Sequence, residues 1–221
     1  MSGITPDFEF LRNVPIFKGL TDEALKTLLS SSTKALFHKG SDIFTIGDKV
    51  KNLYLVEIGE IEIYKYSLEG KKLHLWYCRR GDIFCLPSLY TEQVFTNATA
   101  TQDSLLFVIP KIIVEKLLKD SPSFASDLLR CISSRIMCYS LLVDELAFKG
   151  LKERLANILW RSGEKTEEGI ICRLSLSEMA AYLGTCEEVV SRILKEFRKE
   201  GAISRLGKKR LLLYPEKFNK S

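Results

Sequence analysis

The stretch that decides the fold lies at residues 174–203 and reads LSLSEMAAYLGTCEEVVSRILKEFRKEGAI. A short helix is expected to begin after Ser177 and to end at Gly184, and a second helix is expected to begin at Thr185. Thr185 and Glu188 have the spacing of a capping box, which satisfies two backbone N–H groups at a helix start. Two short helices joined by a turn containing glycine predict a helix-turn-helix, the frame that places a helix in the DNA major groove.

Positive charge is concentrated in the same part of the chain. The net charge is +5, and residues 151–221 hold 15 Lys and Arg against 10 Asp and Glu, whereas residues 1–150 hold 18 of each class. Lys195 and Arg198 continue the second helix, and Gly207-Lys208-Lys209-Arg210 stands at the tip of an expected wing. A basic segment beside a neutral one indicates a module that faces phosphate groups. The alternative is a solvated lysine-rich surface.

Short β-rich runs separated by glycines occupy the chain between Ala35 and Pro110. The runs expected to form strands are Asp42–Ile46, Asn52–Ile58, Ile61–Ser67, Lys72–Tyr77, Ala98–Thr101 and Ser104–Ile109. Glycines fall near the ends of these runs, where turns need positive φ. Short strands at this spacing predict an antiparallel barrel or jelly roll, and a helix over Asp22–Ser30 is expected to precede it.

A long amphipathic helix is expected from Ser121-Pro122 to about Phe148. One apolar stripe has alternating spacings of 4 and 3, and consists of Ala125, Leu129, Ile132, Ile136, Tyr139, Val143 and Leu146. A second and weaker stripe, interrupted by Arg135, consists of Phe124, Leu128, Cys131, Cys138 and Leu142. Two stripes need two partners, and we expect these to be the chain's own barrel and a second copy in a homodimer. The alternative is a core helix buried within one domain.

The sequence therefore predicts three parts. Residues 1–120 are expected to form an effector-sensing domain, residues 121–149 a dimerisation helix with a hinge, and residues 150–221 a DNA-binding domain. No apolar run is long enough to span a membrane, and Met1–Leu11 lacks the pattern of an export signal, so we expect a cytoplasmic protein with reduced cysteines. The chain shows no phosphate loop, nucleophile triad or histidine-rich metal motif, which argues against an enzyme.

Several short motifs resemble the effector domain of the Crp–Fnr superfamily of bacterial transcription regulators. They are Phe37-His38-Lys39-Gly40, Ile46-Gly47-Asp48, Leu53-Tyr54-Leu55-Val56, Gly59 and Gly81-Asp82-Ile83-Phe84. Leu183-Gly184-Thr185 through Arg192-Ile193-Leu194 resembles the recognition element of the same superfamily, and the whole resemblance covers residues 10 to 218. It implies an α+β protein with an N-terminal antiparallel β-roll of the cyclic-nucleotide-binding type, a long dimerisation helix and a C-terminal winged helix-turn-helix.

The resemblance also implies which residues read DNA. Glu188, Ser191 and Arg192 match the Glu-x-x-Ser-Arg pattern of the nitrate-respiration branch, which reads TTGA-type half-sites in a palindrome. Arg192 would donate to a guanine edge and Glu188 would accept from a cytosine amino group. The residues expected to contact phosphates are Thr185, Lys195, Lys208, Lys209 and Arg210. Glu187 stands where the cyclic-AMP branch has Arg, so it either excludes some sequences or points away. RNA polymerase is the expected partner if the protein is an activator.

The effector is left open by the resemblance. The residues expected to line its pocket are Phe84, Cys85, Leu86, Thr96, Asn97, Arg135 and Tyr139. The cyclic-nucleotide branch carries Glu and Arg where this chain has Cys85-Leu86 and Thr96-Asn97, so a cyclic phosphate would lack a counter-charge. Cyclic AMP is therefore not the expected effector.

A haem-based gas sensor is one alternative. Gly81-Asp82-Ile83-Phe84-Cys85 resembles the haem-binding segment of the carbon-monoxide-sensing regulators, in which the Cys is an axial ligand of the iron of haem b. Those regulators have His two residues later, where this chain has Pro87. Cys85 is otherwise interpreted as a small buried residue at a barrel turn. A thiol-redox regulator that uses Cys131 and Cys138 is a further alternative.

Overall fold

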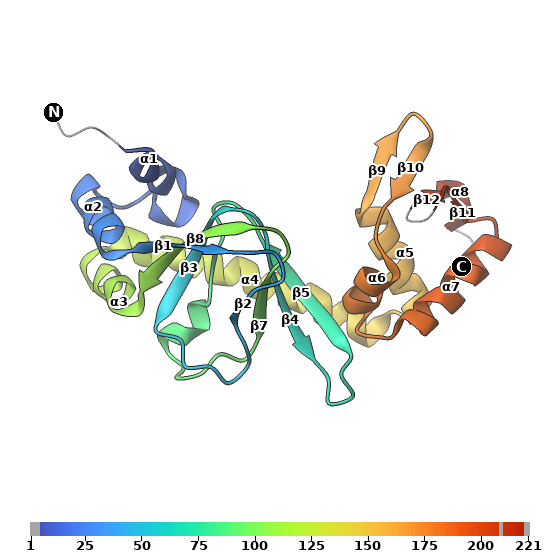
Figure 1. The fold of residues 1–221 in the computed structure, drawn as a ribbon, viewed down its shortest axis with the longest axis horizontal. Coiled ribbons are helices and arrows are strands. Elements are labelled where there is room, and N and C mark those ends of the chain that lie inside the picture. The colour runs from blue at the N-terminus through green and yellow to red at the C-terminus, as the bar shows by residue number, and fades with distance from the viewer. Residues whose placement is uncertain (1–4, 208–209, 219–221) are drawn as a thin grey trace. The chain divides into compact units, whose positions relative to one another are not determined.

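The computed structural model of the 221-residue chain describes residues 5–207 and 210–218. It has the expected α+β architecture, with sheets and helices in both halves of the chain (Figure 1). Met1–Tyr64 and Trp76–Tyr139 form one compact unit, and the remainder of the chain forms a second. Among the described residues no helix is both long and apolar enough to cross a membrane.

Two four-stranded sheets form the β-roll of the N-terminal half, and the paired strands recorded in them run antiparallel. The first sheet has the order β1 (Thr33–Phe37), β8 (Ser104–Pro110), β3 (Asn52–Ile58) and β6 (Ile83–Phe84). The second sheet has the order β2 (Asp42–Phe44), β7 (Asn97–Ala100), β4 (Ile61–Tyr66) and β5 (Lys72–Cys78). Each of the six strands expected from the sequence is present to within two residues at either end, and the predicted β-roll is confirmed.

The first sheet supplies much of the roll's core. Leu53, Leu55 and Phe107 are almost fully buried, and each contributes about 1.5–3 kcal/mol by leaving water. Helices at one end of the roll cover this core, with Phe17 and Phe124 stacked at a centroid distance of 6.1 Å (Figure 1). The short helices of this half are α1 (Pro6–Asn13), η1 (Pro15–Phe17), α2 (Asp22–Ser31), η2 (Leu86–Leu89) and α3 (Lys111–Asp120).

The turn after β3 requires glycine for two separate reasons. Gly59 has φ +98, a region that side-chain-bearing residues avoid, and a β-carbon there would lie 2.7 Å from the Cα of Ser104. Gly70 has a similar φ of +77, but nothing lies within 4 Å of its missing β-carbon. Replacing Gly70 by a larger residue would therefore cause backbone strain alone, whereas replacing Gly59 would cause both strain and a steric clash.

Gly59→Ala is expected to lower the free energy of unfolding by about 2–5 kcal/mol, because strain from positive φ adds to a clash with Ser104. Gly70→Ala is the matched control and should lose only about 1–2 kcal/mol from backbone strain. Urea denaturation of both variants, with the slope compared to that of the wild type, measures the difference. Equal losses in the two variants would show that the close approach to Ser104 is not restrictive.

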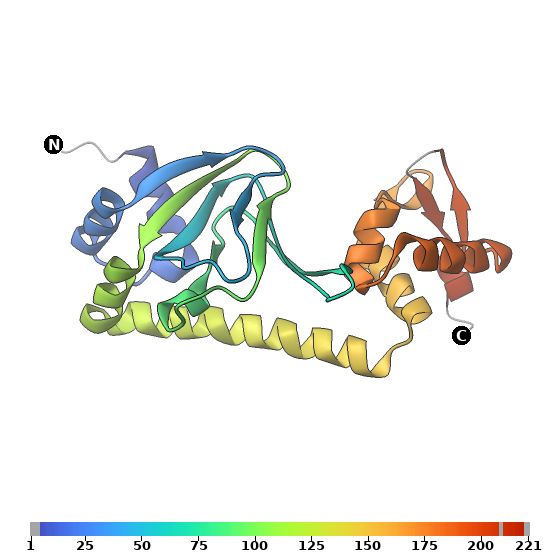
Figure 2. The ribbon, with the colours of Figure 1, turned by 60° about the horizontal axis from the view of Figure 1, so that its bottom comes forward.

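The long helix α4 spans Pro122–Phe148, as expected from the sequence, and is continuous over its 27 residues (Figure 2). Phe124 and Leu128 are buried in the core of the roll. Leu129, Ile136 and Val143, spaced seven residues apart, are 65%, 61% and 59% exposed. The helix thus carries one face that packs on its own unit and one apolar face that no described residue covers.

The C-terminal part of the chain forms the winged helix-turn-helix. Its elements are α5 (Leu151–Arg161), β9 (Gly163–Thr166), β10 (Gly169–Cys172), α6 (Leu176–Leu183), α7 (Glu187–Lys199), β11 (Ile203–Arg205), β12 (Leu211–Leu213) and α8 (Pro215–Phe218). The four strands form one sheet in the order β11-β12-β10-β9, and the residues expected to form the small core are all buried. They are Met179, Leu183, Val190, Ile193, Leu194 and Phe197.

Candidate functional site

The turn between α6 and α7 is closed by Gly184, which has φ +65 and follows the last residue of α6. The backbone N–H of Thr185 donates to the carbonyl of Ala180 at 3.0 Å and so completes the end of α6. Because Thr185 belongs to this closure, α7 begins at Glu187, two residues later, and the side chain of its cap residue, Cys186, accepts no hydrogen bond from the helix backbone. The predicted capping box of Thr185 and Glu188 is therefore wrong.

The capping box of this motif lies at the start of α6 instead. The Ser175 hydroxyl accepts from the backbone N–H of Glu178 at 3.2 Å, and the Glu178 carboxylate accepts from that of Ser175 at 2.7 Å. A cap of this kind stabilises a helix by about 1 kcal/mol. Hydrogen bonds from its own backbone N–H and from Cys186 lower the pKa of Glu188, so its carboxylate is ionised at the start of α7.

A buried arginine fixes the end of α6. Arg154, in α5, is 7% exposed and donates to the carbonyl of Leu183 at 3.0 Å. Burial lowers the pKa of Arg154, and the nearby carboxylate of Glu145 opposes that shift. Glu145 also forms an ion pair with Arg161 at 3.0 Å. Arg154 thereby supports the turn that orients α7.

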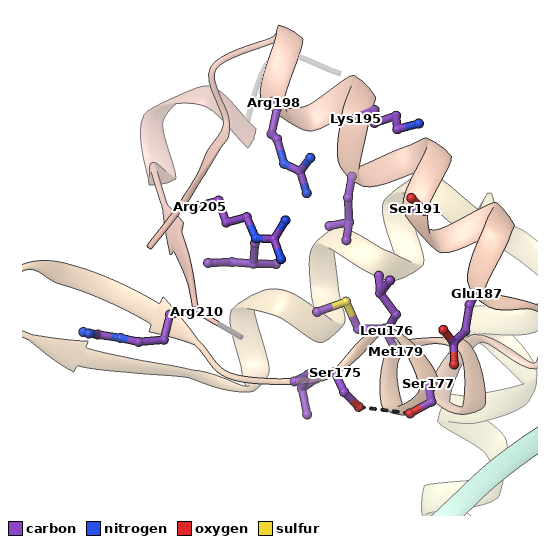
Figure 3. A pocket seen from close by; sticks show the side chains of 13 residues that line it. Ser175, Leu176, Ser177, Met179, Glu187, Ser191, Lys195, Arg198, Arg205 and Arg210 are labelled. Atoms are coloured by element: carbon purple, nitrogen blue, oxygen red, sulfur yellow. Dashed lines mark hydrogen bonds between the residues drawn. The ribbon is translucent and has the colours of Figure 1, made fainter. Parts of the chain in front are cut away.

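An open groove of about 460 Å³ lies where α6, α7 and the wing meet (Figure 3). Its polar and charged lining consists of Ser175, Ser177, Glu187, Ser191, Lys195, Arg198, Arg205 and Arg210. The arginines gather towards the wing, while Glu187 and Ser177 lie at the opposite end (Figure 3). The groove is therefore basic at the wing and carries a carboxylate beside the first turn of α7.

The structure brings together only some of the residues expected to contact DNA. Ser191, Lys195 and Arg210 line the groove, and Arg210 is paired with Glu168 at 2.9 Å. Glu188 and Arg192 are exposed on α7 beside the groove but do not line it. Thr185 is half-buried at the turn, and Lys208 and Lys209 lie outside the described residues.

Several groove residues were not identified from the sequence as DNA contacts. Ser175, Ser177 and Arg205 come from segments on either side of α7, so only the tertiary fold places them beside it. Glu187, which the sequence left undecided, faces the groove together with Ser191, four residues further along the helix (Figure 3). Its carboxylate therefore does not point away from the surface that α7 presents.

A second cavity, of about 270 Å³, lies between the η2 segment and α4 in the N-terminal unit. Phe84, Cys85, Leu86, Arg135 and Tyr139 line it, as expected from the sequence. The residues that the sequence did not identify are Trp76, Ile83, Pro87, Leu89, Tyr90, Phe95, Ile132 and Ile136. Three of the unexpected residues are aromatic, and the lining is mainly apolar.

The two remaining residues expected in the pocket lie elsewhere. Thr96 is buried beside a small void of about 40 Å³ that shares Phe84, Cys85 and Tyr139 with the larger cavity. Asn97 lines neither space, because its side-chain oxygen accepts from the backbone N–H of Ile46 at 3.0 Å. Asn97 therefore links two strand ends and lies outside both spaces, and its role as an effector contact stays a prediction.

The polar groups of the cavity are either neutral or already paired. Burial raises the pKa of Cys85 to about 11 and that of Tyr139 to about 12, so thiol and phenol stay protonated near neutral pH. The Arg135 guanidinium lies 3.7 Å from a carboxylate oxygen of Asp82 and 5.2 Å from the ring centre of Trp76. Trp76 in turn meets Tyr139 edge to face at a centroid distance of 5.2 Å.

A cyclic nucleotide does not fit this set of residues. Its phosphate needs a buried cation or several N–H donors, and Arg135, the one formally charged residue among those lining the cavity, is already held by Asp82. Thr96 and Asn97 supply no charge in place of the missing arginine. The cavity therefore lacks both the sequence motif and the free positive charge that binding of a cyclic nucleotide requires.

Haem does not fit either. Without iron, burial raises the pKa of the Cys85 thiol to about 11, so binding to iron would have to displace its proton. The cavity of about 270 Å³ lies below the range of about 300–1,000 Å³ that is typical of pockets for drug-sized ligands, and a porphyrin is larger than most of these. Within the part of the chain that the structure describes, no group of three or more His, Cys, Asp or Glu side chains could hold a metal ion.

The sequence matches two known domain families. Residues 35–121 match the cyclic nucleotide-binding domain, and residues 153–220 match the Crp-like helix-turn-helix domain. The two matches contain the β-roll strands from β2 to β8 and the helix-turn-helix with its wing. They correspond to the effector and DNA-binding parts of one kind of regulator.

Similar proteins span nearly the whole chain. The anaerobic regulatory protein of Bacillus subtilis is 30% identical over 204 residues, covering 88% of this chain and 86% of that protein. The cyclic AMP receptor protein of Thermus thermophilus is 29% identical over 198 residues, covering 89% of this chain and 91% of that protein.

Solved structures show the same fold. A transcriptional regulator of the Crp/Fnr family from Eubacterium rectale superposes with a TM-score of 0.74 at 25% identity, covering 90% of this chain and 93% of that one. A CooA variant from Carboxydothermus hydrogenoformans superposes with a TM-score of 0.68 at 25% identity, covering 85% of each chain. The protein belongs to the Crp–Fnr superfamily of transcription regulators, which are DNA-binding proteins and not enzymes.

Proposed function

We propose that the protein is a dimeric regulator that binds a palindromic DNA operator with TTGA-type half-sites. The observation that carries this proposal is the groove beside α7, in which Lys195 and Arg198 on the second half of the recognition helix and Arg205 at the wing gather positive charge (Figure 3). When the recognition helix lies in the major groove, cationic side chains beside the helix can contact the phosphate groups that border this groove. In this proposal residues 1–120 sense an effector, residues 121–149 dimerise and residues 150–221 bind DNA.

Base reading is assigned to the exposed face of α7. Arg192 donates to guanine O6 and N7, Glu188 accepts from a cytosine amino group, and Ser191 contacts a neighbouring base. The exposure of Arg192 and Glu188 supports this assignment, because neither side chain is engaged by the core of the domain. Glu187 faces the same groove, where a carboxylate repels phosphate and accepts only from the amino groups of cytosine or adenine.

Phosphate contacts are assigned to the rim of the groove. Ser175 and Ser177 lie at the N-terminus of α6, where the helix dipole favours an anion. Thr185 and Lys195 hold the duplex from the side of α7, and Lys208 and Lys209 from the wing. Arg210 joins them when it exchanges Glu168 for a phosphate. RNA polymerase is a second partner if the protein activates transcription.

The dimer is assigned to α4. Leu129, Ile136 and Val143 form an exposed apolar stripe with a seven-residue repeat, the spacing at which two helices pack along a seam. Two subunits related by a two-fold axis present two recognition helices, and a palindrome presents two equivalent half-sites. Ile132 and Ile136 of α4 also line the effector cavity. A ligand in the cavity would therefore contact the same helix that forms the dimer interface.

Binding of the full chain to a duplex with two TTGA-type half-sites tests the proposal. The duplex should bind at least 1,000-fold more tightly than one of scrambled sequence, about the lower limit for specific DNA-binding proteins. Affinity for both duplexes should fall linearly on a logarithmic salt scale because phosphate contacts release counterions. A mobility-shift titration at several salt concentrations measures both quantities. Equal affinity for the two duplexes at every salt concentration would contradict the proposed function.

A further inference from the structure

The cavity between η2 and α4 sits in a domain whose family is named for a charged ligand, yet its walls are those of an apolar site. Among its lining residues Arg135 carries the one formal charge. Asp82 neutralises this charge from 3.7 Å, and Trp76 covers the guanidinium from 5.2 Å. An anionic ligand would therefore have to displace a carboxylate before it gained a cation.

The walls of the cavity favour a flat ring. Trp76 and Tyr139 meet edge to face, and Phe84 stacks on Tyr54 with ring centres 5.3 Å apart. Phe95 and Tyr90 add two more rings at the η2 side. Aromatic side chains bind another ring through offset or edge contacts that aliphatic ligands do not make. Neutral polar groups for one hydrogen bond are the Tyr139 hydroxyl, the Cys85 thiol and the buried indole N–H of Trp76.

The size of the cavity limits the ligand further. A space of about 270 Å³ equals roughly nine times the share of volume that one water molecule occupies in the liquid. It is smaller than most pockets that hold drug-sized molecules. One substituted ring fits this space, whereas a nucleotide or a porphyrin would extend beyond it.

We propose that this cavity binds an uncharged aromatic molecule with a single ring, and that such a molecule is the effector of the regulator. The first part stands on the cavity alone, and the second rests on the proposed function. The ring lies between Phe84, Trp76 and Ile132, with a hydroxyl or similar group near Tyr139. Because Ile132 and Tyr139 belong to α4, a ligand there contacts the helix to which the dimer is assigned.

Tryptophan emission of the full chain provides the test. The protein has two tryptophans, and Trp160→Phe leaves Trp76, in the cavity wall, as the sole emitter. The probes are 4-methylphenol, which is uncharged at neutral pH, its anionic counterpart 4-methylbenzoate, and cyclic AMP. We expect a saturable change with 4-methylphenol and at least tenfold weaker binding of both anions, equivalent to about 1.4 kcal/mol.

Two substitutions show whether the probe occupies the cavity. Ile132→Phe fills the space and should weaken 4-methylphenol at least tenfold, whereas Ile112→Phe, at an exposed position on α3 outside the cavity, should leave its affinity unchanged. If Ile132→Phe fails to fold by circular dichroism, Pro87→Phe, at an exposed lining position outside α4 and the dimer stripe, replaces it. A response that does not saturate, or that Ile132→Phe and Pro87→Phe leave intact, overturns the proposal.

Two further outcomes also decide it. Tighter binding of cyclic AMP or 4-methylbenzoate than of 4-methylphenol shows that the site takes an anion, and the proposal is then wrong. Binding that is absent in the wild type and appears only when the dimer is disrupted shows that a second subunit covers the cavity, which also overturns it. The titration contains no DNA, so failure of operator binding contradicts the proposed function without affecting the assignment of the cavity's ligand.

Discussion

Arg192→Ala is expected to remove the preference of the protein for its operator while leaving non-specific DNA binding nearly unchanged. A bidentate arginine contact to guanine contributes about 1–3 kcal/mol of discrimination, equivalent to roughly 5- to 150-fold in each half-site. Non-specific affinity depends on phosphate contacts, which the substitution does not touch. Because Arg192 is exposed and outside the core of the domain, the fold should be retained. Competition between operator and scrambled duplex in a mobility-shift assay measures the change.

Lys195→Ala is the matched control on the same helix. Lys195 lines the groove and is assigned to a phosphate, so its loss should weaken all duplexes equally and reduce the salt slope by about one unit for each half-site. The two variants thus distinguish a side chain that recognises bases from one that contacts the phosphate backbone. If Arg192→Ala kept its preference and Lys195→Ala lost it, the assignment of the two side chains would be reversed.

Val143→Lys is expected to convert the dimer into a monomer and to weaken operator binding by about 100-fold or more. Val143 lies on the exposed apolar stripe of α4, and two-fold symmetry would bring the lysines of both subunits to one seam. A monomer engages one half-site at a time, and the gain from linking two sites, commonly about 10²- to 10⁴-fold, is lost. Val143 does not line the effector cavity, so ligand binding should survive.

Ser134→Lys provides the control for charge and position. Ser134 is exposed on α4 but lies off the stripe formed by Leu129, Ile136 and Val143. The variant should stay dimeric and bind the operator like the wild type. Sedimentation velocity of both variants over a range of concentrations decides the matter. A dimeric Val143→Lys, or a monomeric Ser134→Lys, would move the interface away from this stripe.

The elements that could be predicted are those with strong local signals. The bounds of α4 follow from Pro122 at its start and from its apolar repeat, and the strands of the β-roll follow from short β-rich runs bounded by glycines. α3 was not identified because it follows Pro110 directly, without a side-chain cap or an acidic first turn. The strand β9 was not identified because Glu164 and Lys165 are exposed and give no alternation.

The two sites differ in how far they could be predicted. Groove residues on α7 follow from helical spacing, whereas Ser175 and Arg205 enter it only through the tertiary fold. The cap of α7 was misplaced by one residue, since Thr185 is used to close α6 and local spacing does not reveal this. In the cavity, Cys85 and Tyr139 were expected, but the aromatic wall formed by Trp76 and Phe95 depends on how strands and α4 meet.

Cys85 has φ +68, and among the described residues it is the one non-glycine with a positive φ. A left-handed backbone costs about 1–2 kcal/mol for a residue with a β-carbon, whereas glycine adopts it freely. The free energy of unfolding of a whole protein is only about 5–15 kcal/mol, so the strain at this one residue removes a noticeable part of it. Glycine there would make the protein more robust and would leave the cavity without its thiol. At residue 85, a side chain at the cavity wall therefore comes with a lower thermal stability than the same fold would have with glycine there.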